Sequence, residues 1–408
     1  MKKVISMIVA FCAVLAIIIL CVELNRNPAP KPADADSENK TINIGVFEPL
    51  SGDREADGLQ EALGITYANS VCPEVKIGEN TYSIQLIKSD NKSDITLAPA
   101  AARNLLTHNI SAVLGSSGSD LSAAGADIFN EANTPFIGIS GTSSVITESR
   151  KNCFHICSSD AFQGRVMANF AYSRGLSAAA VMTQVGEPYS IALGKYFSEE
   201  FVRLGGKVSE FSFNSAQKNF RDVSAKIKNA KVDLVFMPSS AETGGVFIKQ
   251  ARNNGLTCPI MGGSTWDCGA LITASDRHGR EVFFPSEFDE NDKSNVLGAE
   301  FAINFRSWLK DDDDRIKVNG DDDYISPVSA LGYDAYMLTV EAIKKAASTD
   351  PAKISEALQT LSYEGTAGKI SFDKAGNPGK TSAYIKTIDP KTQKFTVLQT
   401  SSVSAEKK

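Results

Sequence analysis

Residues 113–120, VLGSSGSD, and residues 136–144, FIGISGTSS, are two small-residue loops that decide how this chain folds. Each loop follows a short apolar run and opens a stretch with the composition of a helix. In an open α/β sheet, ligands bind outside the carboxyl ends of the strands, and a helix N-terminus offers an anion unpaired N–H groups and a favourable dipole. The two loops together predict a cradle for a small carboxylate.

Short β-rich runs alternate with longer helical runs on both sides of these loops. The predicted strands cover residues 42–47, 82–87, 113–114, 136–137, 178–183, 207–211, 233–237 and 259–261. The predicted helices cover residues 55–68, 94–107, 121–131, 162–174, 189–204, 220–229 and 242–253. The final third adds helices over 295–309, 327–345 and 351–361, then β-rich segments over 369–372, 383–388 and 395–398. This βαβ repetition predicts an α/β fold with parallel sheets, and its restart near residue 160 predicts two similar units in series.

The charge of the chain excludes one class of partner. With 42 basic and 48 acidic side chains, the formal net charge is -6 at pH 7. Proteins that bind nucleic acid need a positive surface, and no basic and aromatic residues interleave here. We therefore expect no nucleic-acid partner.

The N-terminus predicts export. Lys2 and Lys3 precede an uncharged apolar stretch over residues 4–22, so residues 1–24 are interpreted as a signal peptide or a membrane anchor. Cys21 is a lipidation candidate, although Leu20 stands where a lipoprotein cleavage box has a small residue. Both alternatives, a lipid on Cys21 or an uncleaved helix, leave the protein tethered to the cell membrane outside the cytoplasm. Residues 25–40 are rich in Pro, Ala, Asp and Asn and predict a flexible spacer.

The sequence offers no pattern of catalytic or metal-binding residues. Neither loop matches the Gly-x-Ser-x-Gly turn of a hydrolase, and the chain has only three histidines. The acidic runs at 311–314 and 321–323 lack the alternating spacing of a calcium loop and are interpreted as a solvated surface. A disulfide between Cys258 and Cys268 is one open alternative to free thiols. We expect no enzyme activity, no cofactor and no metal.

Several short motifs recur in the order and spacing of one family. They are residues 49–52 (PLSG), 114–119, 139–142, 162–164 (FQG), 250–256 (QARNNGL) and 332–335 (GYDA). From residue 42 to the C-terminal strands, the chain resembles the type I periplasmic binding proteins of the leucine/isoleucine/valine-binding family, which are the solute receptors of ABC importers.

The resemblance implies two Rossmann-like lobes joined by three crossovers, with the ligand in a cleft that closes by a hinge. It divides the chain into a first lobe of residues 41–159 plus 289–366, a second lobe of residues 160–288 plus 367–400, and a tail over 401–408.

The resemblance also implies roles for individual residues. The hydroxyl of Ser119 and a backbone group of Ser117 match the positions that grip a ligand carboxylate. Ser140 and Thr142 match positions that supply a backbone carbonyl and a hydroxyl. Tyr189 matches a tyrosine of the second lobe that closes over the ligand.

The half of the site that would hold an ammonium group departs from the family pattern. Family members that bind amino acids often have an acidic residue at the position of Ser264 and an aromatic residue at the position of Ser240. Burying an ammonium group without a carboxylate costs several kcal/mol. An amino-acid ligand therefore requires another acid in the pocket, for which the candidates are Asp267, Glu242, Glu187 and Asp57.

The resemblance implies a receptor that binds a small amino acid of the branched-chain kind and delivers it to ABC permease subunits. Two alternatives remain open from the residues. The ligand is a carboxylate or amide without an amino group, as the missing acid at Ser264 favours, or the chain is an extracytoplasmic sensory module that signals to a partner receptor.

Overall fold

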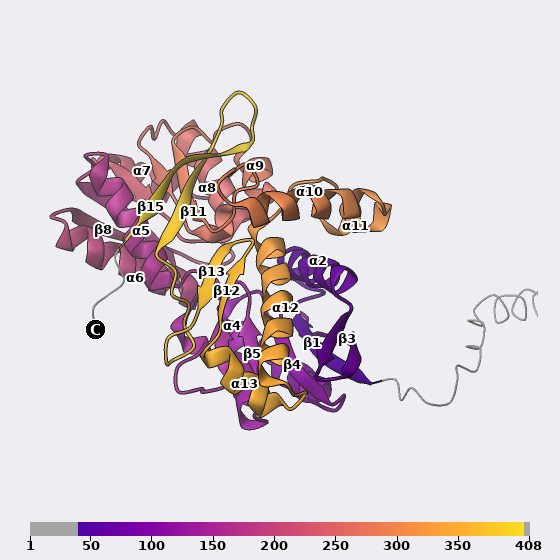
Figure 1. Ribbon diagram of the computed structural model, residues 1–408. Coiled ribbons are helices and arrows are strands. Elements are labelled where there is room, and N and C mark those ends of the chain that lie inside the picture. The colour runs from indigo at the N-terminus through magenta and orange to yellow at the C-terminus, as the bar shows by residue number, and fades with distance from the viewer. Residues whose placement is uncertain (1–39, 404–408) are drawn as a thin grey trace, which may run out of the picture. The chain divides into compact units, whose positions relative to one another are not determined.

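The computed structural model describes residues 40–403, which form two α/β lobes (Figure 1). No helix within this range is long and apolar enough to cross a bilayer. The predicted signal or anchor segment with Cys21, and the spacer up to residue 39, lie outside the described residues.

The first lobe is built on a six-stranded sheet in the order β2-β3-β1-β4-β5-β6. Its strands are β1 (Thr41–Glu48), β2 (Glu74–Ile77), β3 (Asn80–Asp90), β4 (Ile110–Gly115), β5 (Phe136–Gly138) and β6 (Cys153–His155). Neighbours pair in parallel except β2 and β3, which form an antiparallel hairpin. The predicted parallel sheet is confirmed, with β2 as an additional edge strand.

The second lobe is built on a seven-stranded sheet in the order β15-β14-β11-β10-β9-β7-β8. Its strands are β7 (Ala178–Gln184), β8 (Lys207–Phe213), β9 (Leu234–Phe236), β10 (Ile260–Met261), β11 (Val282–Ser286), β14 (Ser382–Ile388) and β15 (Phe395–Ser402). The strands from β7 to β11 pair in parallel, whereas β14 and β15 add an antiparallel edge. Its helices are α5 (Asp160–Ser173), α6 (Pro188–Arg203), α7 (Arg221–Asn229), α8 (Ala241–Asn253) and α9 (Gly269–Ser275).

Three crossovers join the two lobes. The chain leaves the first sheet after β6, returns after β11, and enters the second sheet again before β14. The returning segment adds helices and a hairpin, which are α10 (Val296–Lys310), α11 (Asp313–Val318), α12 (Pro327–Ala346), α13 (Pro351–Gln359), β12 (Ser362–Gly365) and β13 (Gly368–Ser371). Ile370 of β13 packs into the core of the first lobe.

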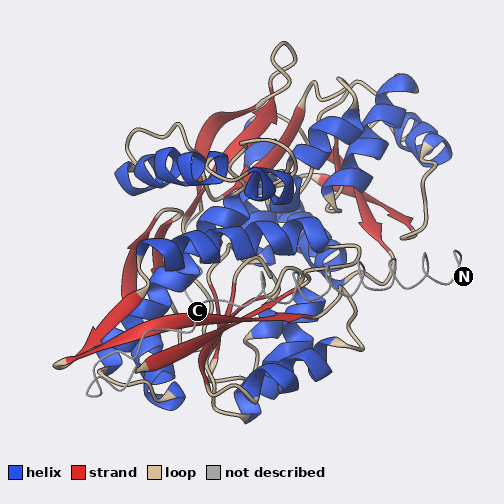
Figure 2. Cartoon of the chain, turned by 90° about the vertical axis from the view of Figure 1, so that its right-hand side faces the viewer, coloured by secondary structure: helices blue, strands red, loops and turns tan. Residues whose placement is uncertain are grey.

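Helices flank both sheets (Figure 2). The remaining helices of the first lobe are α2 (Glu55–Val71), α3 (Ala98–Leu106) and α4 (Ser119–Glu131). Helix α2 lies directly beside α12 (Figure 1), and their backbones touch at two glycines. A Cβ atom at Gly64 would overlap the carbonyl group of Ser329, and one at Gly332 would overlap the carbonyl group of Glu61. This close contact fixes the position of α2.

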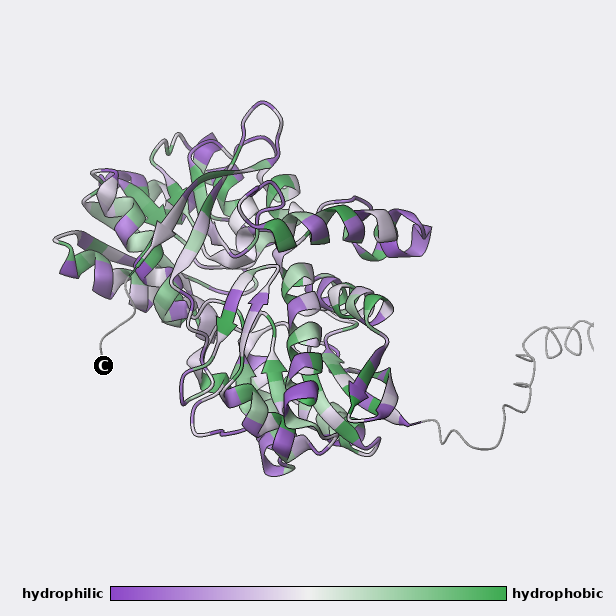
Figure 3. Cartoon of the chain, viewed as in Figure 1, coloured by the Kyte–Doolittle hydropathy of each residue, from purple (hydrophilic) through white to green (hydrophobic). Residues whose placement is uncertain are grey.

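Apolar residues recur along the strands of both sheets (Figure 3). Successive strand residues point to opposite faces, so each sheet is buried on both sides. On β1, Val46 belongs to the core on one face and Phe47 to the core on the other. On β7, Val181 and Met182 divide in the same way. The strands are therefore fixed by apolar packing on both faces of each sheet, and the polar residues lie in the loops at the strand ends.

Candidate functional site

The two small-residue loops lie side by side at one edge of the first sheet. Strands β4 and β5 are parallel neighbours, so the first loop (residues 116–118) and the second loop (residues 139–143) leave the sheet at the same edge. The backbone N–H of Ser143 donates a hydrogen bond of 3.3 Å to the hydroxyl of Ser119. Helix α4 begins at Ser119, so the first N–H groups of that helix also face this edge.

The first loop is held from behind by a carboxylate and an amide. The N–H of Ser117 donates a 2.8 Å hydrogen bond to Oε2 of Glu48, which ends β1. Nδ2 of Asn91 donates a 2.9 Å hydrogen bond to Oγ of Ser116. The backbone N–H of Ser117 is thus already bonded within the protein.

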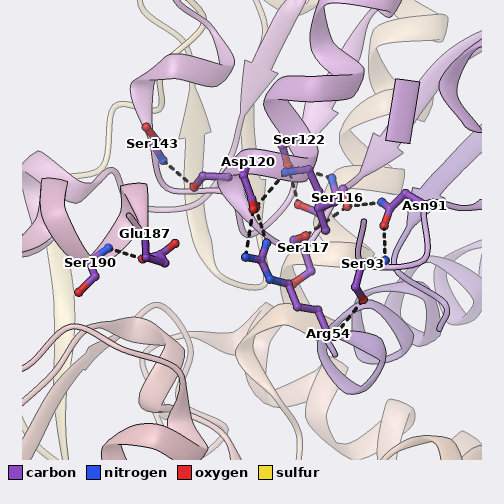
Figure 4. Close-up of polar contacts among 12 residues, drawn as sticks. Arg54, Asn91, Ser93, Ser116, Ser117, Asp120, Ser122, Ser143, Glu187 and Ser190 are labelled. Carbon is purple, nitrogen blue, oxygen red and sulfur yellow. Dashed lines mark hydrogen bonds and ion pairs between the residues drawn. The ribbon is translucent and has the colours of Figure 1, made fainter. Parts of the chain in front are cut away.

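Arg54 lies over the first loop. A Cβ atom at Gly118 would overlap the Arg54 guanidinium, and the φ of +91° at Gly118 also suits only a glycine. Arg54 forms an ion pair with Asp120 in the first turn of α4 (Figure 4). Glu187 approaches this pair from the second lobe, where it caps α6. Burial raises the pKa of the Glu187 carboxyl, while the charge of Arg54 opposes the shift.

The second loop is bonded to two further carboxyl groups. The hydroxyl of Ser140 donates to Glu61 on α2. The hydroxyl of Thr142 donates a 2.7 Å hydrogen bond to Oδ1 of Asp160, the first residue of α5. Burial raises the pKa of Asp160 to about 7, although the hydrogen bond from Thr142 lowers it.

The second lobe contributes Tyr189 near the first lobe. Tyr189 is buried in the first turn of α6, and its hydroxyl lies 3.2 Å from Oγ1 of Thr265. Burial raises its pKa, and the nearby charge of Asp160 adds to the shift. The Tyr189 ring packs in the core of the second lobe with its hydroxyl against Gly263, while α6 itself touches α4 of the first lobe.

Ser240 and Ser264, the two positions at which the sequence departs from the family pattern, both form hydrogen bonds within the protein. Ser240 caps α8, where its hydroxyl accepts a 3.4 Å hydrogen bond from the N–H of Thr243. The N–H of Ser264 donates a 3.0 Å hydrogen bond to Oε1 of Gln163 on α5.

Both carboxylate oxygens of Asp267 are hydrogen-bonded to other side chains of the protein. Its side chain is 1% exposed, and Oδ2 accepts a 2.8 Å hydrogen bond from the Lys386 ammonium on β14. Oδ1 accepts a hydrogen bond from the hydroxyl of Tyr324, just before α12. Both carboxylate oxygens are therefore used to join parts of the chain, which removes the reason for expecting Asp267 to face a ligand.

Two buried carboxyl groups behind the loops, Glu48 and Glu61, are absent from the predicted site residues. Both are fully buried. Burial is the main cause that raises the pKa of Glu61 to about 8 and the pKa of Glu48 well above its usual range, and the charge of Glu61 adds to the shift at Glu48. The i, i+4 spacing of Asp57 and Glu61 on one helix is the sequence signal that points to this cluster.

Other groups singled out in the sequence lie elsewhere. Cys258 and Cys268 both have free thiols, so the open disulfide alternative is wrong. A surface hollow of about 550 Å³ lies on the second lobe between α6 and β8, and none of the loop residues lines it.

The loops at the strand ends and the three crossovers define the class of solute-binding proteins with two hinged lobes. Residues 41–394 match the model of the periplasmic binding protein family, so the chain belongs to that family. It is a solute-binding protein of the kind that serves ABC transporters, and this class acts outside the cytoplasm and consists of binding proteins rather than enzymes.

Three known proteins illustrate the similarity. The chain is 24% identical to Leu/Ile/Val-binding protein homolog 2 of Brucella abortus (strain 2308), over 83% of this chain and 87% of that protein. The crystal structure of the leucine-binding protein LivK from Thermotoga maritima has 26% identity and a TM-score of 0.80, over 89% of this chain and 99% of that one. A solute-binding protein of R. palustris in complex with benzoate has 19% identity and a TM-score of 0.77, over 90% and 98% of the two chains. This last likeness is one of fold.

Proposed function

We propose that this protein is an extracytoplasmic receptor that binds a small amino acid of the branched-chain kind and delivers it to ABC permease subunits. The observation that carries the proposal is the bridge between Ser143 and Ser119, which brings two hydroxyl-rich loops together at the start of α4. Such a site suits a carboxylate, because N–H groups and the helix dipole both favour an anion there.

The proposed binding mode uses both lobes. The first lobe captures the carboxylate through the hydroxyl of Ser119 and the first N–H groups of α4, while the backbone carbonyl of Ser140 and the hydroxyl of Thr142 contact the rest of the ligand. Tyr189 then covers the ligand when the second lobe closes, and the closed surface is what the permease recognises. The approach of α6 to α4 supports this arrangement.

A ligand without an amino group is the second candidate. Ser264 has no acidic side chain, and its N–H is bonded to Gln163. This absence of an acid removes one expected partner for an ammonium group, and the fold also accommodates benzoate in the R. palustris protein. We favour the amino acid because several other carboxyl groups surround the two loops.

We also propose that the N-terminal segment tethers the receptor to the membrane. The apolar stretch over residues 4–22 and the candidate lipid site at Cys21 support a tether by either route. Metabolic labelling with a radioactive fatty acid distinguishes the two: label that is lost in Cys21→Ala indicates a lipoprotein, and a membrane-bound but unlabelled protein indicates an uncleaved helix.

Calorimetric titration of the purified full chain tests the ligand class. The panel is leucine, isoleucine and valine, the matching 2-oxo acids, and benzoate. Saturable 1:1 binding of an amino acid supports the first candidate, and binding of 2-oxo acids or benzoate alone supports the second. If no carboxylate in the panel binds, the proposed carboxylate cradle is wrong.

A further inference from the structure

Glu287 and Lys380 form a buried ion pair where the chain passes between the lobes. Glu287 directly follows β11, at the start of the second crossover, and Lys380 lies in the third crossover, just before β14. The Lys380 ammonium lies 3.6 Å from Oε2 of Glu287, and the two side chains are only 7% and 6% exposed. Lysine and glutamate are almost never buried to this extent unless they are paired, so the pair is a built feature of the crossovers.

The same ion pair also binds the first crossover and the first lobe. The backbone N–H of Ser158, between β6 and α5, donates a 2.6 Å hydrogen bond to Oε1 of Glu287. Nζ of Lys380 donates a 2.7 Å hydrogen bond to the carbonyl oxygen of Ala367, which packs in the core of the first lobe. Burial raises the pKa of the Glu287 carboxyl, and the charge of Lys380 and the hydrogen bonds from Ser158 oppose this shift. One ion pair therefore connects all three crossovers.

Gln163 extends these connections to a loop of the second lobe. Its side chain is buried near the start of α5, where Nε2 donates a 3.0 Å hydrogen bond to the carbonyl oxygen of Ser158. Oε1 of Gln163 accepts a 3.0 Å hydrogen bond from the N–H of Ser264. The next residue, Thr265, lies 3.2 Å from the hydroxyl of Tyr189. A continuous series of hydrogen bonds therefore links the crossovers to the loop that carries Ser264.

We propose that Glu287 is the positioning residue of the hinge, because with Lys380 it holds the three crossovers at fixed positions relative to one another. Through Ser158 and Gln163 it also fixes the loop of Ser264 relative to the crossovers. Three unconnected crossovers would bend independently, so the lobes would move in several directions. Crossovers that are bonded to one another bend together, which restricts the lobes to one path of opening and closing.

The restriction affects ligand binding, and this part of the inference rests on the proposed function. Only some arrangements of the two lobes can close on a ligand, and the observed affinity falls in proportion to the fraction of molecules in a competent arrangement. Loosened crossovers would spread the unliganded protein over more arrangements. Glu287 then strengthens binding without touching the ligand.

Three variants separate the positioning role from stability. Lys380→Met leaves the buried carboxylate of Glu287 without its counter-ion, and Lys380→Arg keeps the positive charge. The double variant Glu287→Met/Lys380→Met replaces the ion pair by apolar side chains, which is often neutral for stability where removal of one partner is not. The double variant therefore tests the lost connections in a folded protein. Lys317→Met is the control, because Lys317 pairs with Asp314 in an exposed position within α11.

The first measurement needs no ligand. Spin labels on non-natural amino acids replace Glu131 at the end of α4 and Lys226 on α7, two exposed positions on different lobes. Pulsed electron paramagnetic resonance on the unliganded full chain then gives the distribution of distances between the lobes. We expect a broader distribution in Lys380→Met and in the double variant than in the parent, Lys380→Arg and Lys317→Met.

The second measurement is calorimetric titration with leucine. We expect the double variant to bind leucine roughly 2- to 30-fold more weakly than the parent, the range typical of residues that couple through a network. Lys380→Arg should restore most of the affinity, and thermal melting should show that the double variant is folded. Glu287→Gln keeps an acceptor for Ser158, so it should broaden the distance distribution less, and it replaces the double variant if that protein does not fold.

The inference is overturned if the folded double variant, or Glu287→Gln in its place, has the same distance distribution as the parent. Equal broadening in Lys317→Met also overturns it. A broader distribution with unchanged leucine affinity overturns the effect on binding. If the parent binds no amino acid, the proposed function fails, whereas the distance distribution still decides the role of Glu287.

Discussion

The backbone N–H of Ser117 donates a 2.8 Å hydrogen bond to Oε2 of Glu48, so one amide of the candidate cradle already holds a carboxylate oxygen from the protein itself. A ligand carboxylate at this edge must then use other donors. The hydroxyl of Ser119 and the first N–H groups of α4 are the donors that remain on the same loop.

Replacement of Ser119 by alanine tests whether its hydroxyl binds the ligand carboxylate. We expect Ser119→Ala to weaken ligand binding by roughly 10- to 150-fold, because a hydrogen bond to a charged group contributes about 1.5–3 kcal/mol. Ser144→Ala removes a hydroxyl from an exposed position beside the second loop and serves as the control. Equal affinities in calorimetry for Ser119→Ala and the parent would remove Ser119 from the site.

Replacement of Lys386 tests the buried ion pair. Lys386→Met leaves the buried carboxylate of Asp267 without its counter-ion, which we expect to lower the free energy of unfolding by about 3–5 kcal/mol. Lys317 pairs with Asp314 at the surface, where water screens the two charges, so Lys317→Met should leave the free energy of unfolding nearly unchanged. Urea denaturation measures both values, and a similar small loss in the two variants would contradict the assigned role.

Replacement of Gly64 tests the contact between α2 and α12. The added methyl group of Gly64→Ala has no room against Ser329, so we expect a loss of about 1–3 kcal/mol or more. Gly269 begins α9, and a Cβ atom there would lie 3.8 Å from its nearest neighbour, Oδ2 of Asp322, so Gly269→Ala should be nearly neutral. A neutral Gly64→Ala would show that the two helices separate easily.

The buried pair behind the loops predicts a pH dependence of stability. Glu61 has a pKa of about 8 in the folded protein, above its usual value of 4.5, so the folded state keeps a proton that the unfolded state releases. The contribution of Glu61 to the free energy of unfolding should therefore be fully present below pH 4.5. This contribution should be lost as the pH rises toward 8.

Glu61→Gln should remove most of this decline, because the amide does not ionise. Denaturation of the unliganded parent and variant at pH 5 and pH 8 measures the difference, and Glu55→Gln provides the exposed control. A parallel decline in parent and Glu61→Gln would place the titrating group elsewhere.

The order of strands and helices could be predicted from the sequence because parallel strands buried on both faces leave long apolar runs between polar loops. The edge strand β2 has only four residues, with one buried side chain, and gives no such run. Strand β11 contains Pro285, a residue that normally argues against a central strand. Both strands are missing from the predicted elements for these reasons.

The candidate site was only partly predictable. The hydroxyl residues Ser119 and Thr142 follow strand ends, so their position is visible in the sequence. The partners of Asp267 are not, because Lys386 lies 119 positions further along the chain and meets it only through the pairing of β14 with β11. Glu48 shares this difficulty, since a single acid beside an apolar run has the same pattern as a surface residue, and the spacing of Asp57 and Glu61 shows only that the two acids share one helix face.

The hydrogen bond from Tyr324 to Asp267 also has a mechanical consequence. Tyr324 leads into α12 of the first lobe, and Asp267 is anchored to the second sheet through Lys386. Pulling the lobes straight apart would strip a buried charge of its donor, whereas turning them about this point would not. We therefore expect the relative motion of the lobes to be a rotation whose axis passes near Tyr324, with the largest displacement at the edge farthest from it.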